Sequence, residues 1–135
     1  MRTAMFVEKA KRRIIFSGDW VTAAELVELP AETVNELRPD VYSLLRERRI
    51  FAISYGGVDY FPTFAFDAYS GYHPVPGLKD VFEVLATRKD AWGMALWFGS
   101  SNSYLGGRQP KALIRTDLGV VLDAARDEVY GILHG

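Results

Sequence analysis

Side chains able to carry out catalysis are few in this sequence of 135 residues, which contains two histidines and no cysteine. His73 lies directly before a proline and His134 is the penultimate residue, so neither belongs to a metal-ligand spacing. The sequence also lacks a glycine-rich phosphate-binding loop and a nucleophile elbow. We therefore expect a protein that is not an enzyme, with no catalytic residue, no metal site and no cofactor.

One pair of carboxylates, Asp123 and Asp127, could in principle supply a general acid and a general base. The two residues fall one turn apart on the outer face of a predicted helix, beside Arg126 and Glu128. Charges of both signs on one helix face are typical of a surface in contact with water. We therefore interpret this pair as surface charge.

Aromatic and glycine residues in the last third of the chain indicate binding rather than turnover. Trp97 and Phe98 are adjacent on a predicted helix, so their side chains point about 100° apart. At least one of them should pack in the core, and either could instead contact a partner. Gly106 and Gly107 predict a turn with positive φ angles. Arg108 follows that turn, and its guanidinium is predicted either to cap an internal carbonyl group or to meet a carboxylate of a partner.

The last predicted helix begins at a cap formed by Thr116 or Asp117 and has the clearest amphipathic pattern of the chain. It leads into the terminal residues 130–135. A blunt, apolar helix end with a histidine could enter a pocket of another protein, although a terminus of this kind can also simply fray. The apolar stripe of the helix consists of Leu118, Val121, Leu122, Ala125, Val129 and Ile132.

A cluster of arginines surrounds one predicted helix in the first half of the chain: Arg38 precedes it, and Arg46, Arg48 and Arg49 follow its apolar stripe. The planar guanidinium group donates two parallel hydrogen bonds to a phosphate, so these residues could contact DNA. The alternative is a solvated helix end, where cations offset the helix dipole. Because the net charge is -1, DNA binding would depend on this local clustering rather than on overall charge.

Composition places the chain among globular proteins, with 49% hydrophobic residues. No run of about 18 apolar residues occurs, so we expect no membrane-spanning helix. The start of the chain meets charged residues too early for a signal peptide. The absence of cysteine favours a reducing compartment, and we predict a cytoplasmic location.

Periodicity and turn signals predict mainly α structure. In the first half we expect helices at residues 4–16, 22–29 and 39–48, the second of which starts with a capping box at Thr22 and Glu25. A β-hairpin follows around Gly56 and Gly57. Short helices and a hairpin outline a helix-turn-helix-like, winged unit.

We expect the second half to form a helical bundle. Helical patterns start at Leu78, Asp90, Pro110 and Thr116 or Asp117. Between the two halves, a segment rich in glycine and proline indicates a linker. The predicted organisation is a helix-turn-helix-like unit with a small hairpin at 1–66, a linker at 67–77 and a helical domain at 78–135.

The second half resembles the toxin-binding domain of the Xre/MbcA/ParS antitoxins over about residues 78–135. The resemblance consists of an aromatic pair, an asparagine before a Leu-Gly turn, an Arg-x-Pro, a leucine and a final helix that ends in glycine. The upstream half is similar to a subset of these antitoxins, with Trp20, Thr22, Glu25 and the Arg49-Ile50-Phe51-Ala52 segment. The residues that match in the second half are Trp97, Phe98, Asn102, Leu105, Gly106, Gly107, Arg108, Pro110, Leu113, Ala124, Ala125 and Gly135.

The resemblance implies an antitoxin of a type II toxin–antitoxin module. In this family the partner is typically a RES-domain toxin that depletes NAD, and the antitoxin occludes the toxin's active site. Such antitoxins commonly form homodimers and often bind operator DNA to repress their own operon. The alternative that we retain is a DNA-binding transcriptional regulator without toxin neutralisation. The implied toxin-binding residues are Trp97, Phe98, Asn102, Leu105, Gly106, Gly107, Arg108, Tyr130, Leu133, His134 and Gly135.

Overall fold

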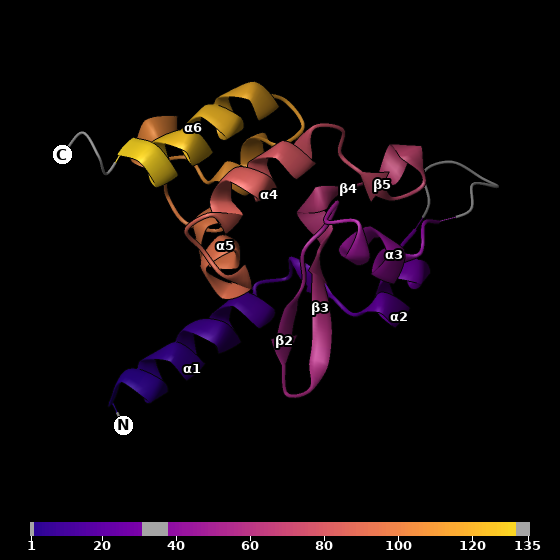
Figure 1. Cartoon of the computed structure of the whole chain (residues 1–135). Helices are drawn as coiled ribbons and strands as arrows, with labels where there is room; N and C mark the ends of the chain where they lie inside the picture. Colours follow the sequence, from indigo (N-terminus) through magenta and orange to yellow (C-terminus); the bar gives the residue numbers. More distant parts are fainter. Residues whose placement is uncertain (1, 31–37, 132–135) are drawn as a thin grey trace.

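A computed structural model of the chain describes residues 2–30 and 38–131 and has a mixed α/β architecture (Figure 1). The described residues contain six α-helices, a three-stranded antiparallel sheet and a two-stranded sheet. The prediction of a mainly α fold, with a helix-turn-helix-like unit, one hairpin and a C-terminal helical bundle, is therefore wrong. Three strands of two residues each, too short to show an alternating pattern, extend the sheet structure beyond the hairpin. Strand β1 pairs with a strand far along the chain, whereas β4 and β5 pair with each other across a short connection.

The chain begins with helix α1 (Arg2–Ile15), which extends away from the rest of the molecule in Figure 1. Strand β1 (Trp20–Val21) and helix α2 (Ala23–Glu28) follow. The predicted capping box is confirmed, because the amide of Glu25 donates to the Thr22 hydroxyl at 3.1 Å and the Thr22 amide donates to the Glu25 carboxylate at 2.9 Å. These bonds set the start of α2 directly after β1.

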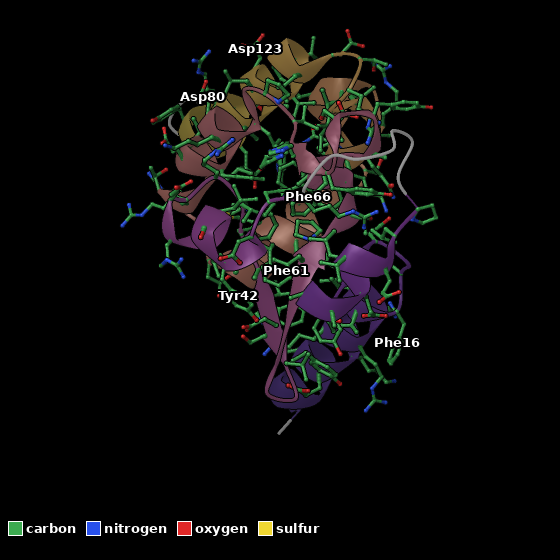
Figure 2. All side chains as sticks on the ribbon, turned by 90° about the vertical axis from the view of Figure 1, so that its right-hand side faces the viewer. Phe16, Tyr42, Phe61, Phe66, Asp80 and Asp123 are labelled. Carbon is green, nitrogen blue, oxygen red and sulfur yellow. The ribbon has the colours of Figure 1, made fainter. Side chains whose placement is uncertain are left out.

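Helix α3 (Val41–Arg46) starts at Asp40, whose carboxylate accepts from the Tyr42 amide at 3.1 Å. Residues 29–40 separate α2 from α3 in the sequence, and residues 31–37 of this segment lie outside the described part of the chain. Tyr42 packs edge-on against Phe61, with ring centroids 5.6 Å apart (Figure 2). Helix α3 therefore contacts strand β3 through Tyr42.

The predicted hairpin is present as strands β2 (Ile53–Tyr55) and β3 (Val58–Pro62). Gly56 and Gly57 join the strands with φ angles of 59° and 78°, as a type I′ turn requires. Strand β3 is central in the order β1-β3-β2, because Trp20 and Val21 pair with Pro62 and Phe61. This pairing brings the start of the chain onto the hairpin.

The predicted linker at 67–77 overlaps the second sheet, which pairs strand β4 (Phe66–Asp67) with strand β5 (His73–Pro74). Short 3-10 helices at Thr63–Ala65 and Ala68–Ser70 flank β4. Arg115 ties this sheet to the second half of the chain, since its guanidinium donates to the Phe66 carbonyl at 2.8 Å. The division of the chain at this segment stays a prediction.

Helices α4 (Leu78–Ala86), α5 (Ala91–Phe98) and α6 (Leu118–Tyr130) form the upper part of the molecule in Figure 1. Helix α6 packs along α4 and buries the side chains of Val121, Ala124, Ala125 and Val129. None of the helices within residues 2–30 and 38–131 is long and apolar enough to cross a membrane.

An aromatic cluster joins the two halves of the chain. Phe98 of α5 is fully buried, and its ring centroid lies 5.2 Å from that of Phe64, 5.9 Å from that of Phe82 and 6.2 Å from that of Phe51. Trp20 of β1 packs edge-on against Phe51 and Phe64. Helices α4 and α5 and the sheet therefore share one hydrophobic core.

Candidate partner-binding surface

A short loop at 101–108 forms one side of the candidate surface, and Asn102 organises it. The Asn102 side-chain oxygen accepts from the Tyr104 amide at 2.9 Å and so starts the 3-10 helix η3 (Ser103–Leu105). The Asn102 backbone carbonyl accepts from the amides of Leu105 and Gly107 at 3.1 and 2.8 Å. The Asn102 amide donates to the Arg108 carbonyl at 3.1 Å. The predicted binding residue Asn102 thus holds both ends of the loop together.

The two glycines of the loop have φ angles of 67° and 88°, as the sequence predicts for Gly106 and Gly107. The Ser101 hydroxyl braces the turn by donating to the Gly107 carbonyl at 2.6 Å. Arg108 Nε donates to the Leu105 carbonyl at 3.1 Å, so of the two roles left open for Arg108 the structure contains the internal carbonyl cap. The loop is therefore a rigid platform.

Two exposed tyrosines stand beside this platform. Tyr104 of η3 is 50% exposed and Tyr130, at the end of α6, is 51% exposed. Both line one shallow hollow of about 300 Å³, together with Asp123, Arg126, Asp127 and Gly131 of the same region. Tyrosines are enriched in protein interfaces, because they bury a large rigid surface and keep a polar hydroxyl. This arrangement is suited to a protein partner.

The carboxylate of Asp127 separates this hollow from a second one. The second hollow has a volume of about 340 Å³ and is lined by Trp97, Asp127, Glu128 and the polar residues 100–103. Among residues 2–30 and 38–131, no cation lies within 4.0 Å of the Asp127 carboxylate. By contrast, Asp123 pairs with Arg126 at 3.6 Å and Glu128 pairs with Lys89 at 2.8 Å. Asp127 is therefore available to a cation of a partner.

Gly131 leaves space for this carboxylate. A Cβ atom added at Gly131 would lie 2.7 Å from the Asp127 Oδ1 atom, closer than real Cβ contacts allow. Any larger residue at this position would force the Asp127 side chain to move. The glycine thus contributes to the position of the carboxylate between the two hollows.

Trp97 lines the second hollow, although its side chain is only 7% exposed. Its indole Nε1 atom is the buried side-chain polar atom that lacks a hydrogen-bond partner within the described part of the chain. A buried donor without a partner costs about 1–3 kcal/mol, and such groups are rare in folded proteins. Because this atom is buried, it is a feature of the interior and not of the surface that a partner would meet.

Two predicted contact residues are core residues instead. Phe98 is 0% exposed at the centre of the aromatic cluster, and Leu105 is 2% exposed beneath the loop. A direct contact of either side chain with a partner is therefore a wrong prediction, because no surface of either is accessible. Leu133, His134 and Gly135 lie outside the described residues, so their predicted role stays a prediction.

The fold uses the predicted DNA-binding arginines in different ways. Arg38 donates to the carbonyl of Leu26 at 2.6 Å and to that of Leu29, at the end of α2. Its guanidinium also lies over the Tyr72 ring, 4.4 Å from the centroid. Two donors of Arg38 are therefore used within the fold, and its predicted phosphate contact stays a prediction.

The other three arginines of that cluster are exposed near the end of α3. Arg46 donates to the Ser43 hydroxyl at 2.9 Å, and Arg49 lies 3.7 Å from the Glu47 carboxylate. Arg48 lines a separate groove, described below.

Two groups at the start of α3, Asp40 and Tyr42, have shifted pKa values. Hydrogen bonds from the Ser43 hydroxyl, at 2.9 Å, and from the Tyr42 amide hold the pKa of Asp40 below its usual value. Desolvation, followed by the hydrogen bond to Asp59, raises the pKa of Tyr42. Both groups use their polarity to stabilise local structure.

Sequence reasoning missed Tyr104 and the role of Asp127. Asp127 was interpreted as ordinary surface charge, because the spacing of acids and bases on α6 says nothing of which carboxylate lacks a cation. Two signals were available in the sequence. Tyr104 lies next to a predicted turn, and Asp127 and Tyr130 lie about one helical turn apart. Comparisons with protein-family models, with curated proteins and with solved structures give no match for this chain.

Proposed function

We propose that this chain is the antitoxin of a type II toxin–antitoxin module, which binds a RES-type, NAD-depleting toxin and occludes its active site. The proposal combines the resemblance of residues 78–135 to Xre/MbcA/ParS antitoxins with the surface formed by η3 and α6. In this role the protein has no turnover of its own, acts in the cytoplasm and works as a homodimer.

The observation that carries the proposal is the grouping of unsatisfied contacts on one surface. Tyr104 and Tyr130 are exposed beside Asp127, whose carboxylate has no cation within 4.0 Å among the described residues. A partner that supplies a cation for Asp127 should gain more binding free energy than the buried contact area alone would provide.

The surface defines the chemistry expected of the partner. An arginine of the toxin can place its guanidinium on Asp127 and against the faces of Tyr104 and Tyr130, since a cation over a tyrosine ring gains about 0.5–2 kcal/mol. The proposed contact is therefore a cation presented by one surface of the toxin.

Coexpression with the product of an adjacent RES-type reading frame tests the proposal. We expect the wild-type chain to copurify with the toxin and to restore growth and cellular NAD. Asp127→Arg combined with Tyr130→Ala should abolish both effects, because the introduced cation repels the toxin's cation. Asp80→Asn, on the exposed side of α4, is the matched control and should neutralise like wild type (Figure 2). Full neutralisation by the double variant would contradict this surface.

The terminal residues provide a second arm of the same experiment. The sequence predicts that Leu133→Asp, or deletion of residues 131–135, abolishes neutralisation while the chain stays folded. If these variants fail and the Asp127 and Tyr130 variant neutralises, the blocking surface lies at the terminus instead of on η3 and α6. Neutralisation by every variant would remove the occlusion hypothesis.

Operator DNA is the second candidate partner, favoured by the exposed side chains of Arg46, Arg48 and Arg49. Binding through phosphates would weaken steeply with salt. The logarithm of the affinity should fall with the logarithm of the salt concentration, with a slope close to the number of phosphate contacts. Replacing Arg46 and Arg49 by alanine should lower that slope by about two. Affinity that is independent of salt, or no binding to the upstream promoter, would eliminate this role.

A further inference from the structure

An apolar groove lies on another side of the molecule from the tyrosines. It has a volume of about 560 Å³ and runs between the end of α3, the residues before β2, helix α4 and the start of α5. Buried apolar side chains form its floor. They include Ile50, Phe51, Phe82 and Met94.

Three polar side chains stand in the wall of this groove, and two of them are occupied. Glu83 lies 3.9 Å from Lys79, and the Thr87 hydroxyl donates to the Val84 carbonyl at 2.7 Å. The third is Arg48, and no carboxylate of the described residues lies within 4.0 Å of its guanidinium. The groove therefore combines an apolar floor with Arg48, a cation that has no ion pair among the described residues, and with the carboxylate of Glu83, whose pair with Lys79 is long and exposed.

The backbone at Arg48 is unusual for its residue type. The amide of Arg48 donates to the Leu45 carbonyl at 3.1 Å and that of Arg49 to the Leu44 carbonyl at 2.9 Å, which is the hydrogen-bond pattern of a Schellman motif. Arg48 occupies its left-handed position with a φ of 60°, where glycine is the favoured residue. An arginine is tolerated here at a cost in folding stability, which points to a use for its side chain.

We propose that this groove binds a small apolar carboxylate, with its hydrocarbon body on Phe51 and Phe82 and its carboxylate on Arg48. The volume lies within the range of about 300–1,000 Å³ that is usual for small-molecule sites. A single free cation fits one anionic head group, and guanidinium binds a carboxylate through two parallel hydrogen bonds. This site is separate from the proposed toxin-binding surface and does not depend on it.

The test uses phenylbutyrate and its neutral analogue phenylbutyramide as probes of the full chain, with amide chemical shifts as the readout. We expect phenylbutyrate to shift the amides of Phe51, Phe82 and Met94 in a saturable way, and the neutral analogue to bind about tenfold more weakly. Arg48→Gly should remove this preference and melt at the same or a higher temperature, since glycine suits the left-handed position. Arg49→Ala is the matched control and should bind both probes like wild type.

Ala86→Trp provides an independent check, because a large side chain at this exposed position in the groove wall should block both probes. Equal affinity for acid and amide, or acid binding that is unchanged in Arg48→Gly, would overturn the role of Arg48. Absence of saturable shifts at the groove, or shifts confined to other regions, would overturn the site itself. Neither result bears on toxin neutralisation, which the Asp127 and Tyr130 variants measure.

Discussion

The two regions in which the sequence predicted binding, the arginine cluster around α3 and the surface of η3 and α6, differ in how the fold uses their polar groups. Arg38 is bonded to two carbonyls at the end of α2, and Asp40 and Asp59 accept from side chains near them. On the other surface, Asp127 has no such partner within the described chain. Residue type alone suggests binding in both regions, whereas hydrogen-bond satisfaction distinguishes them.

The lesson is that a charged residue is a candidate for binding only after its internal partners are known. An arginine whose donors are used by backbone carbonyls supports the fold, and its removal costs stability. Removing a carboxylate that has no cation near it, beside exposed tyrosines, should change the folding stability little. It should lower the specificity of a complex that uses the carboxylate. The following variants test this distinction through stability.

The largest effect is expected for Phe98→Ala, which separates core residues from surface residues on helix α5. The variant should lower the free energy of unfolding by about 3–5 kcal/mol, because it leaves a cavity where the sheet meets α4 and α5. Denaturant unfolding measures the loss. Leu96→Ala, two residues earlier and 55% exposed, is the control and should lie within about 0.5 kcal/mol of wild type. Equal losses would mean that Phe98 is not at the centre of the core.

A smaller loss is expected for Arg38→Ala, which tests the contrast between arginines directly. The variant removes two charge-assisted hydrogen bonds and the contact with Tyr72, and should cost about 1.5–3 kcal/mol of unfolding free energy. Arg46→Ala, at an exposed position, should cost less than about 0.5 kcal/mol. If both variants unfold like wild type, Arg38 is free for a phosphate after all and the distinction fails.

Two glycines should respond with opposite signs to the same substitution. Gly107→Ala should cost about 1 kcal/mol, since its φ of 88° strains any side chain in the loop that supports Tyr104. Gly119→Ala should gain about 0.5–1 kcal/mol, because Gly119 is helical and an added Cβ meets nothing within 4 Å. Thermal unfolding of both variants measures the difference. A stabilising Gly107→Ala would show that the loop is not rigid.

The smallest effect concerns Asp40, whose pKa is depressed in the folded state chiefly by the Ser43 hydroxyl. A depressed carboxyl pKa stabilises the fold above the unfolded-state pKa, and the stabilisation disappears as the pH falls through the folded-state value. Ser43→Ala should therefore raise the Asp40 pKa towards its usual value and flatten the acid limb of the stability curve. A carboxyl-carbon NMR titration measures the shift, and an unchanged pKa would exclude the hydroxyl as its main cause.

Local signals predicted much of the structure and long-range pairing limited the rest. The Thr22 and Glu25 capping box, the Gly56-Gly57 turn and the burial of Val121, Ala125 and Val129 in the predicted stripe of α6 are confirmed because each depends on residues close in sequence. The predicted stripe residue Ile132 lies outside the described residues. The β1 and β4–β5 strands were missed, since a two-residue strand carries no periodicity, and the partner of β1 is in addition set by packing with a distant part of the chain.

The candidate site divides in the same way. Asn102 and the glycines were found by their turn chemistry, which is local. The Asp127 carboxylate has no cation near it and the Trp97 indole has no acceptor among the described residues. Both features result from the packing of α5, η3 and α6, which no pattern in the sequence specifies. A search for exposed tyrosines flanking a predicted turn would have pointed to Tyr104.

The central position of strand β3 has a consequence for the order of folding. Its hairpin neighbour β2 is adjacent in the chain, whereas Trp20 must close a long loop to reach Pro62. During synthesis, β1 has no edge to join until β3 has left the ribosome, and the ring of Trp20 lacks one of its two aromatic neighbours, Phe51 and Phe64, until Phe64 follows. Quenching of Trp20 fluorescence would therefore report a late kinetic phase, after the hairpin has already closed.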